Sequence, residues 1–126
     1  MASPTDRKYT QTHEWIKLEG DVATLGITKF AVDELTDVTY AQMKAAGTSL
    51  KPGDPVAEVE SVKATSDVYS PVAGTIAEIN KKLDADPSLV NTSPYGDGWL
   101  VKIKVSDPAP LNALMDASAY DAKHHS

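Results

Sequence analysis

One lysine, Lys63, lies between two strand-like segments in the stretch Glu58-Val-Glu-Ser-Val-Lys-Ala-Thr-Ser-Asp-Val-Tyr-Ser-Pro-Val-Ala-Gly74. Before it, residues 56–62 alternate between two faces with a period of two. After the polar residues 65–67, which we take as the tip of the turn, apolar strand character resumes from Val68. Two such runs around a short polar break predict a β-hairpin. A lysine at the apex of this hairpin is held out in solvent on a rigid base, where an enzyme could attach a group to it.

On spacing alone, Lys63 is interpreted as an ordinary solvated turn lysine, because turns are polar and lysine keeps strand edges from aggregating. Four further segments change this interpretation. They are Tyr9-Thr-Gln-Thr-His-Glu-Trp15, Gly26-Ile-Thr28, Asn91-Thr-Ser-Pro-Tyr-Gly-Asp-Gly-Trp-Leu100 and the tail from Leu114-Met115 to Tyr120. Together with the lysine hairpin, and in the same order, they resemble the glycine cleavage system H-protein family over residues 8–120. Five motifs in register are far more specific than any one of them.

The fold class expected from this resemblance is mainly β. It is a flattened barrel-sandwich hybrid of the lipoyl and biotinyl type, extended by an N-terminal hairpin, short helices and a C-terminal helix. The sequence pattern predicts the same fold class, because short strands separated by frequent turn signals are typical of sandwiches and barrels. At 126 residues, the chain is expected to form a single domain over residues 1–126. We expect its core at about residues 8–120, with residues 1–7 and 121–126 as frayed ends.

Local patterns predict the elements around the lysine hairpin. Residues 15–27 are expected to form a hairpin that turns at Glu19-Gly20-Asp21, and Thr28 is expected to cap a helix over residues 29–35. Further strands are expected at 38–43 and 75–80, and an alternating strand is expected through Trp99, Val101, Ile103 and Val105. Asp86-Pro87 is expected to open a helical turn. A helix is expected from Asp107-Pro108, with Leu111, Leu114 and Met115 on one face.

Charge and composition narrow the possible functions. The net charge is −6 and the pI is about 4.9, which disfavours a nucleic-acid partner because such binding depends on clustered Lys and Arg. The absence of cysteine excludes disulfides, zinc-thiolate sites and thiol nucleophiles. No apolar run is long enough to cross a membrane, and the polar N-terminus does not look like a signal or transit peptide. We therefore expect a bacterial cytoplasmic protein, or a mitochondrial matrix protein if the chain is a mature eukaryotic one.

The resemblance implies a role in glycine catabolism and one-carbon metabolism. Lys63 would carry lipoic acid, covalently bound as N6-lipoyllysine, and the chain would be a non-catalytic carrier and a monomer. The lipoyl group would carry the aminomethyl intermediate from a pyridoxal-phosphate (PLP)-dependent glycine decarboxylase to a tetrahydrofolate-dependent aminomethyltransferase. A dihydrolipoyl dehydrogenase would reoxidise it. A lipoate ligase or lipoyl transferase would attach it, with Glu60 either as a recognition residue or as an exposed strand carboxylate.

The resemblance also implies a cleft that receives the loaded arm, lined by Thr12, Glu14 and Asp67. An aminomethyl group on sulfur is a protonated amine, which carboxylates and a hydroxyl can hold by charge-assisted hydrogen bonds. Burying this amine would limit attack by water. Thr12 stands where a serine is also found in the family.

Two other motifs are incomplete. His13-Glu14 is half of a His-Glu-x-x-His zinc motif, but Lys17 occupies the position of the second histidine, so no metal site is expected. Met43-Lys44 partly matches the biotin-carrier motif, but Ala45 follows where that motif has methionine. The remaining alternatives are an H-like lipoate-relay protein and an unmodified β-rich interaction domain. A lipoyl domain of a 2-oxo acid dehydrogenase fits less well, because Val62 precedes the lysine where those domains usually have aspartate.

Overall fold

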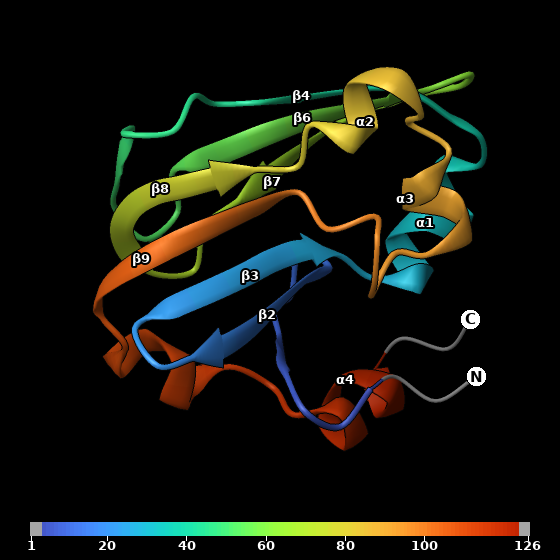
Figure 1. Ribbon diagram of the computed structural model, residues 1–126. Coiled ribbons are helices and arrows are strands. Elements are labelled where there is room, and N and C mark those ends of the chain that lie inside the picture. Colours follow the sequence, from blue (N-terminus) through green and yellow to red (C-terminus); the bar gives the residue numbers. More distant parts are fainter. Residues whose placement is uncertain (1–3, 124–126) are drawn as a thin grey trace.

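The computed structural model describes residues 4–123, which form two antiparallel sheets and several short helices. The strands of the larger sheet, in their order across it, are β1 (Lys8–Tyr9), β2 (Glu14–Glu19), β3 (Val22–Ile27), β9 (Val101–Asp107), β8 (Ala73–Ile79) and β5 (Ser49–Leu50). The strands of the smaller sheet are β4 (Val38–Met43), β6 (Pro55–Ser61) and β7 (Thr65–Tyr69). Figure 1 shows the smaller sheet at the top and strands β9, β3 and β2 below it.

Two hydrophobic clusters hold this arrangement together. The larger cluster joins the two sheets and contains, among others, Leu25, Val59, Ile76 and Ile103. The smaller cluster contains Tyr9, Trp15, Ala117 and Tyr120. Because successive side chains of a strand point to opposite faces, Trp15 and its neighbour Ile16 contribute to different clusters. The mainly β prediction is confirmed, and within residues 4–123 the strands form two separate hydrogen-bonded sheets.

The N-terminal hairpin and the first helix are confirmed. Strands β2 and β3 pair from Glu14–Ile27 to Glu19–Val22, and Gly20 in the turn has φ of 66°, a conformation that glycine adopts easily. Helix α1 (Lys29–Leu35) follows directly. The side chain of Thr28 caps it by accepting a 3.3 Å hydrogen bond from the backbone N–H of Ala31.

Two short helices connect β8 to β9. They are α2 (Lys82–Ala85), which the sequence did not indicate, and α3 (Leu89–Thr92), which matches the helical turn expected after Asp86-Pro87. Asn91 on α3 ties this connection to the other side of the molecule. Its amide accepts a 2.8 Å bond from the N–H of Val38 and donates a 2.6 Å bond to the carbonyl of Thr36. The segment after α1 is thereby fixed where it enters β4.

The C-terminal segment differs from the single helix that the sequence predicted. It forms a 3-10 helix η1 (Ala109–Ala113), an extended link and then helix α4 (Ala117–Lys123). In the link, Met115 exchanges two backbone hydrogen bonds with Tyr9, of 2.8 and 3.0 Å. Pairing with β1 therefore splits the predicted apolar stripe of Leu111, Leu114 and Met115.

The structure describes part of each chain end, at residues 4–7 and 121–123. The side chain of Arg7 is only 9% exposed, and residues 121–123 complete helix α4. Residues 1–3 and 124–126 lie outside the described part of the chain. The expectation that these positions fray therefore stays a prediction. Of the helices in residues 4–123, none is long and apolar enough to cross a lipid bilayer.

Candidate functional site

The lysine hairpin is formed by β6 and β7, and Lys63 lies in its tip between Val62 and Ala64. The prediction that residues 65–67 form the polar tip is wrong. Those residues are the first three of β7, where Asp67 pairs with Glu58 and Ser66 with Val59. They are polar because their strand lies at a sheet edge, not because the chain turns there. The hairpin projects beyond the body of the molecule at the upper right of Figure 1.

Ser61 closes the tip. Its backbone N–H donates to the carbonyl of Ala64 at 2.8 Å, and its hydroxyl accepts from the N–H groups of Lys63 and Ala64 at 3.3 and 3.1 Å. The N–H of Val62 donates to the carbonyl of Asp37 at 3.1 Å, which ties the tip to the chain before β4. The backbone around Lys63 is therefore held in one conformation, as a serine in a turn allows.

The side chains at the tip point to solvent. Lys63 is exposed, and Val62 is an exposed large apolar residue at 68%. In the described part of the chain, no carboxylate forms an ion pair with Lys63. Glu60, three residues before Lys63, is half-buried on β6. It lies opposite Tyr40 on β4 and opposite Thr65 on β7.

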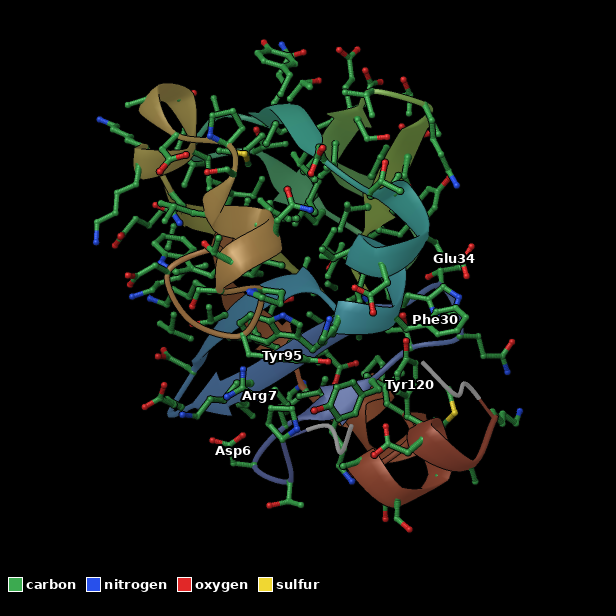
Figure 2. All side chains as sticks on the ribbon, turned by 90° about the vertical axis from the view of Figure 1, so that its right-hand side faces the viewer. Asp6, Arg7, Phe30, Glu34, Tyr95 and Tyr120 are labelled. Carbon is green, nitrogen blue, oxygen red and sulfur yellow. The ribbon has the colours of Figure 1, made fainter. Side chains whose placement is uncertain are left out.

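A cavity of about 430 Å³ lies beside the hairpin, between α1 and β7, and we call it the α1–β7 cleft. The lining residues are Thr12, His13, Ile27, Phe30, Ala31, Glu34, Leu35, Val59, Ser66, Asp67 and Val68. Its polar members include Thr12 and Asp67, two of the three residues expected to receive a loaded arm. Its volume lies in the usual range for small-ligand pockets, roughly 300–1,000 Å³. Figure 2 shows two further lining residues, Phe30 and Glu34, side by side on α1.

Glu14 does not line the cleft but lies behind Thr12. It is 1% exposed, and one carboxylate oxygen accepts hydrogen bonds from the hydroxyls of Thr10, at 2.5 Å, and of Thr12. The other oxygen accepts a 3.1 Å bond from the backbone N–H of Tyr69. Burial raises the pKa of Glu14, and the hydrogen bonds from the two threonines and from Tyr69 oppose this rise. Glu14 therefore joins the loop before β2 to the end of β7, and it orients the Thr12 hydroxyl at the cleft.

The opposite side of this loop is held by helix α4. His13 has φ of 70°, which is uncommon for a residue other than glycine. Its Nδ1 lies 2.8 Å from the hydroxyl of Tyr120, which also lies 2.7 Å from Oγ1 of Thr28. The imidazole ring of His13 lies against the ring of Phe30, and the two ring centroids are 4.7 Å apart. The buried Tyr120 thus fixes the wall of the cleft from the far side, and burial raises its pKa to about 12.

Several residues of the cleft were not predicted from the sequence. From the sequence, His13 was interpreted only as half of a zinc motif. Among the described residues, no group of His, Asp and Glu side chains could hold a metal ion. Phe30 and Glu34 are spaced i, i+4 on α1, so the sequence does indicate that they share a helix face. Ser66 and Val68 alternate with Asp67 along β7. Which of these faces meet depends on how α1 packs against the sheet, and no local pattern reports that.

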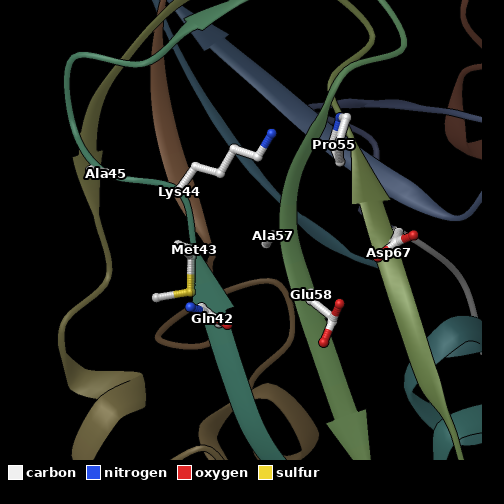
Figure 3. A pocket seen from close by; sticks show the side chains of 8 residues that line it. All are labelled: Gln42, Met43, Lys44, Ala45, Pro55, Ala57, Glu58 and Asp67. Atoms are coloured by element: carbon white, nitrogen blue, oxygen red, sulfur yellow. The ribbon is translucent and has the colours of Figure 1, made fainter.

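A second cavity of about 450 Å³ opens along the ends of β4, β6 and β7, and Asp67 lines both cavities. Figure 3 shows Met43 and Lys44 on its β4 side and Glu58 and Asp67 on the strands opposite. Met43-Lys44, the partial biotin motif, therefore lies at the end of a strand and not at a hairpin apex. The N–H of Lys44 bonds the carbonyl of Val56 at 2.9 Å, which continues the pairing of β4 with β6.

Comparisons with known proteins identify the family to which the chain belongs. The family model for the glycine cleavage H-protein matches residues 7–126. A glycine cleavage system H protein from Chlorobium limicola is 51% identical over 122 residues, which cover 95% of this chain and 95% of that protein. The corresponding protein from Thermotoga maritima is 49% identical over 114 residues, with 90% and 92% covered.

A solved structure supports the same assignment. The crystal structure of a glycine cleavage system H protein from Mycobacterium marinum superposes with a TM-score of 0.88 at 36% sequence identity, and the match covers 96% of this chain and 98% of that one. A likeness at this level of identity and coverage extends through both sheets and the C-terminal segment. The chain therefore belongs to the glycine cleavage H-protein family.

Proposed function

We propose that this chain is the non-catalytic lipoyl carrier of the glycine cleavage system, with lipoic acid attached to Lys63 as N6-lipoyllysine. The observation that carries the proposal is the placement of Lys63. It is exposed at the tip of a hairpin whose backbone Ser61 closes, and the hairpin belongs to a chain that matches the H-protein family over residues 7–126. An attaching enzyme needs an accessible lysine, and the hydrogen-bonded backbone of the tip presents Lys63 at a defined place.

The residues around the hairpin fit such an arm. Ser66 and Asp67 lie on β7, three and four residues after Lys63, so their backbones are at most about 11 and 14 Å from that of Lys63. A lysine side chain lengthened by a medium-length acyl chain spans that distance. The α1–β7 cleft has an apolar floor that includes Ile27, Leu35 and Val59, which suits the hydrocarbon and sulfur atoms of the arm.

When bound, the lipoyl group supplies a disulfide that accepts the aminomethyl group and is restored by oxidation. The side chains of this protein hold and shield what the arm carries. Thr12 and Asp67 line the cleft, where a hydroxyl and a carboxylate bind a protonated amine. Glu14 supports this site from behind by accepting the Thr12 hydrogen bond, and the apolar floor excludes water.

The partners follow from this role. They are the PLP-dependent glycine decarboxylase, the tetrahydrofolate-dependent aminomethyltransferase and the dihydrolipoyl dehydrogenase, each visited by the arm in turn. A lipoate ligase or lipoyl transferase attaches the group, and it recognises Glu60 on the strand that leads to the tip. The protein acts as a monomer. The relatives named above are bacterial, and we place this activity in the bacterial cytoplasm.

The test is an intact-mass measurement before and after incubation with lipoate, ATP and a lipoate ligase. The wild-type protein is expected to gain one lipoyl increment, and Lys63→Arg, which keeps the charge at the tip, is expected to gain none. Lys51→Arg, which changes an exposed lysine of another turn, is the matched control and should be modified normally. An unmodified wild-type protein, or a modified Lys63→Arg variant, would show that the attachment site is wrong.

A further inference from the structure

A third cavity, of about 200 Å³, lies over β2, β3 and β9, on the larger sheet and away from the lysine hairpin. We call it the β2–β9 basic site. Its described lining contains three cations and three aromatic rings, which are Arg7, Lys17, Lys102, Trp15, Tyr95 and Trp99. Glu19 is the one carboxylate among these described lining residues. Three cations around one small cavity stand out in a chain whose net charge is −6.

The strand register brings these cations together. Lys17 on β2 lies opposite Thr24 on β3, and Thr24 lies opposite Lys102 on β9. Side chains directly opposite one another across antiparallel strands share a face, so the two lysines flank Thr24 in one row. Trp15 lies two residues before Lys17 and therefore shares the same face.

Aromatic rings hold two of the three cations in position. The guanidinium carbon of Arg7 lies 4.6 Å from the ring centroid of Trp15 and 5.6 Å from that of Tyr95. The ammonium of Lys102 lies 5.1 Å from the ring centroid of Trp99. Figure 2 shows Arg7 below Tyr95, with Asp6 beside it at the surface. Cations that are ordered before binding lose less conformational entropy when an anion binds them.

A carboxylate of the chain itself already bridges two of these cations. Asp6 is 52% exposed, and its two oxygens lie 2.8 Å from Nε of Arg7 and 3.3 Å from Nζ of Lys17. The hydrogen bond from Arg7 lowers the pKa of Asp6, and the bond from Lys17 acts in the same direction. Glu78 on β8 lies opposite Lys102 in the strand register, but within residues 4–123 no carboxylate forms an ion pair with Lys102. The site therefore binds a carboxylate now, and it has the charge to bind another.

We propose that the β2–β9 basic site is a docking site for an acidic peptide segment of a partner protein, whose Asp or Glu carboxylate binds Lys17 and Lys102 and displaces Asp6 from Lys17. At about 200 Å³ the cavity is smaller than typical small-ligand pockets, which span roughly 300–1,000 Å³, and it suits a single side chain. A nucleic acid is disfavoured, because its long run of phosphates would extend beyond these three cations onto a surface that is acidic as a whole. A partner docked here leaves the Lys63 hairpin free, because the site lies on the other sheet.

The test is a titration of the full-length, isotopically labelled protein with a capped tetraglutamate peptide at low salt, followed by NMR. The indole N–H signals of Trp15 and Trp99 report on the two ends of the site. We expect saturable shifts at both indoles that weaken as salt is added. Inorganic phosphate, titrated in parallel, is expected to bind more weakly than the peptide.

Three variants make the expected results specific. The double variant Lys17→Gln with Lys102→Gln should weaken peptide binding by roughly 3- to 10-fold, the effect of losing two exposed charge pairs. Asp6→Asn removes the internal competitor and should strengthen binding by about 2-fold or more. Lys81→Gln changes an exposed lysine outside the site and should leave binding unchanged. Absent or non-saturable indole shifts, undiminished binding by the double variant, or tighter binding of phosphate than of the peptide would overturn the proposal.

Discussion

Glu14 is the residue on which the cleft depends, although it does not line it. It is 1% exposed, and hydrogen bonds from Thr10, Thr12 and Tyr69 reach its two oxygens. Removing this carboxylate from water raises its pKa above the ordinary value of 4.5. The hydrogen bonds stabilise the charged form, but burial is the larger effect. Burying the carboxylate therefore costs stability, and in the proposed carrier role this cost accompanies the orientation of the Thr12 hydroxyl.

The pH dependence of stability tests this account of Glu14. A raised pKa means that the folded protein keeps a proton at pH values where the unfolded chain has released it. The contribution of Glu14 to the free energy of unfolding is thus present below the unfolded-state pKa, and it is lost as the pH rises through the folded-state pKa. Gln does not titrate, so the stability of Glu14→Gln relative to wild type should increase from about pH 4 to about pH 8. Urea unfolding across this range measures the difference, and a difference that is constant with pH would contradict the account.

The hydroxyl of Thr12 gives a functional prediction at the same scale, which rests on the proposed carrier role. Thr12→Val keeps the shape of the side chain but removes the donor to Glu14 and the polar group at the cleft. We expect the aminomethyl-loaded arm to lose its group to water about tenfold faster, because a hydrogen bond to a charged group contributes about 1.5–3 kcal/mol. Thr12→Ser retains the hydroxyl and should behave like wild type. Release of formaldehyde from the loaded protein measures the rate, and equal rates in the three proteins would exclude this role.

At the scale of elements, two glycines in the larger sheet lie where a Cβ atom would overlap with a neighbouring strand. A Cβ at Gly26 would lie 2.7 Å from the ring of Trp15, its cross-strand neighbour. A Cβ at Gly74 would meet the backbone carbonyl of Lys104 and lie 2.8 Å from a methyl carbon of Ile103. The contact at Gly74 is the more severe, because a backbone carbonyl within a strand cannot rotate away as a side chain can. The close approach of β8 and β9 therefore depends on Gly74.

Gly74→Ala is accordingly expected to destabilise the protein. The added methyl group should force β8 and β9 apart and lower the free energy of unfolding by about 1–3 kcal/mol. Thr75→Ala, at the next and exposed position of the same strand, should change it by no more than about 0.5 kcal/mol. Chemical denaturation measures the free energy of unfolding of both variants relative to wild type. Equal stabilities of the two variants would show that β9 can move without cost.

Helix α4 is expected to act on the cleft through one hydroxyl. Tyr120→Phe removes the group that contacts Nδ1 of His13 and Oγ1 of Thr28, and should cost about 1–2 kcal/mol of stability. This corresponds to a loss of a few degrees in Tm. Tyr40→Phe is the matched control, because Tyr40 is 47% exposed on β4. Thermal unfolding compares the two variants, and a Tyr120→Phe protein as stable as Tyr40→Phe would mean that α4 does not brace the cleft.

At the scale of the whole molecule, patterns that are local in the chain were predicted correctly. The hairpin at residues 15–27, the Thr28 cap and the strand at 38–43 were all found from spacing and turn residues. The tip of the lysine hairpin was misplaced because polar residues at the start of an edge strand resemble a turn. The C-terminal helix was predicted as continuous because its apolar spacing is helical, but pairing of Met115 with Tyr9 overrides it.

The candidate site was only partly predictable for the same reason. Thr12, Lys63 and Asp67 were identified from motifs that resemble a family. The wall of the cleft depends on contacts between distant segments, such as the hydroxyl of Tyr120 with His13, which are 107 positions apart. The β2–β9 basic site likewise arises from register, because Lys17 and Lys102 meet only when β3 pairs with both of their strands. Neither arrangement leaves a signal in any short window of the sequence.

The measurement that tests the carrier role most directly is the intact mass of the lipoylated protein after incubation with glycine and the PLP-dependent decarboxylase. The account predicts that the lipoylated wild-type protein gains one aminomethyl increment. It also predicts that Lys63→Arg, taken through the same lipoylation and loading steps, gains none. A lipoylated wild-type protein that takes up nothing from glycine, in the presence of a decarboxylase that loads an established H protein, would contradict the account.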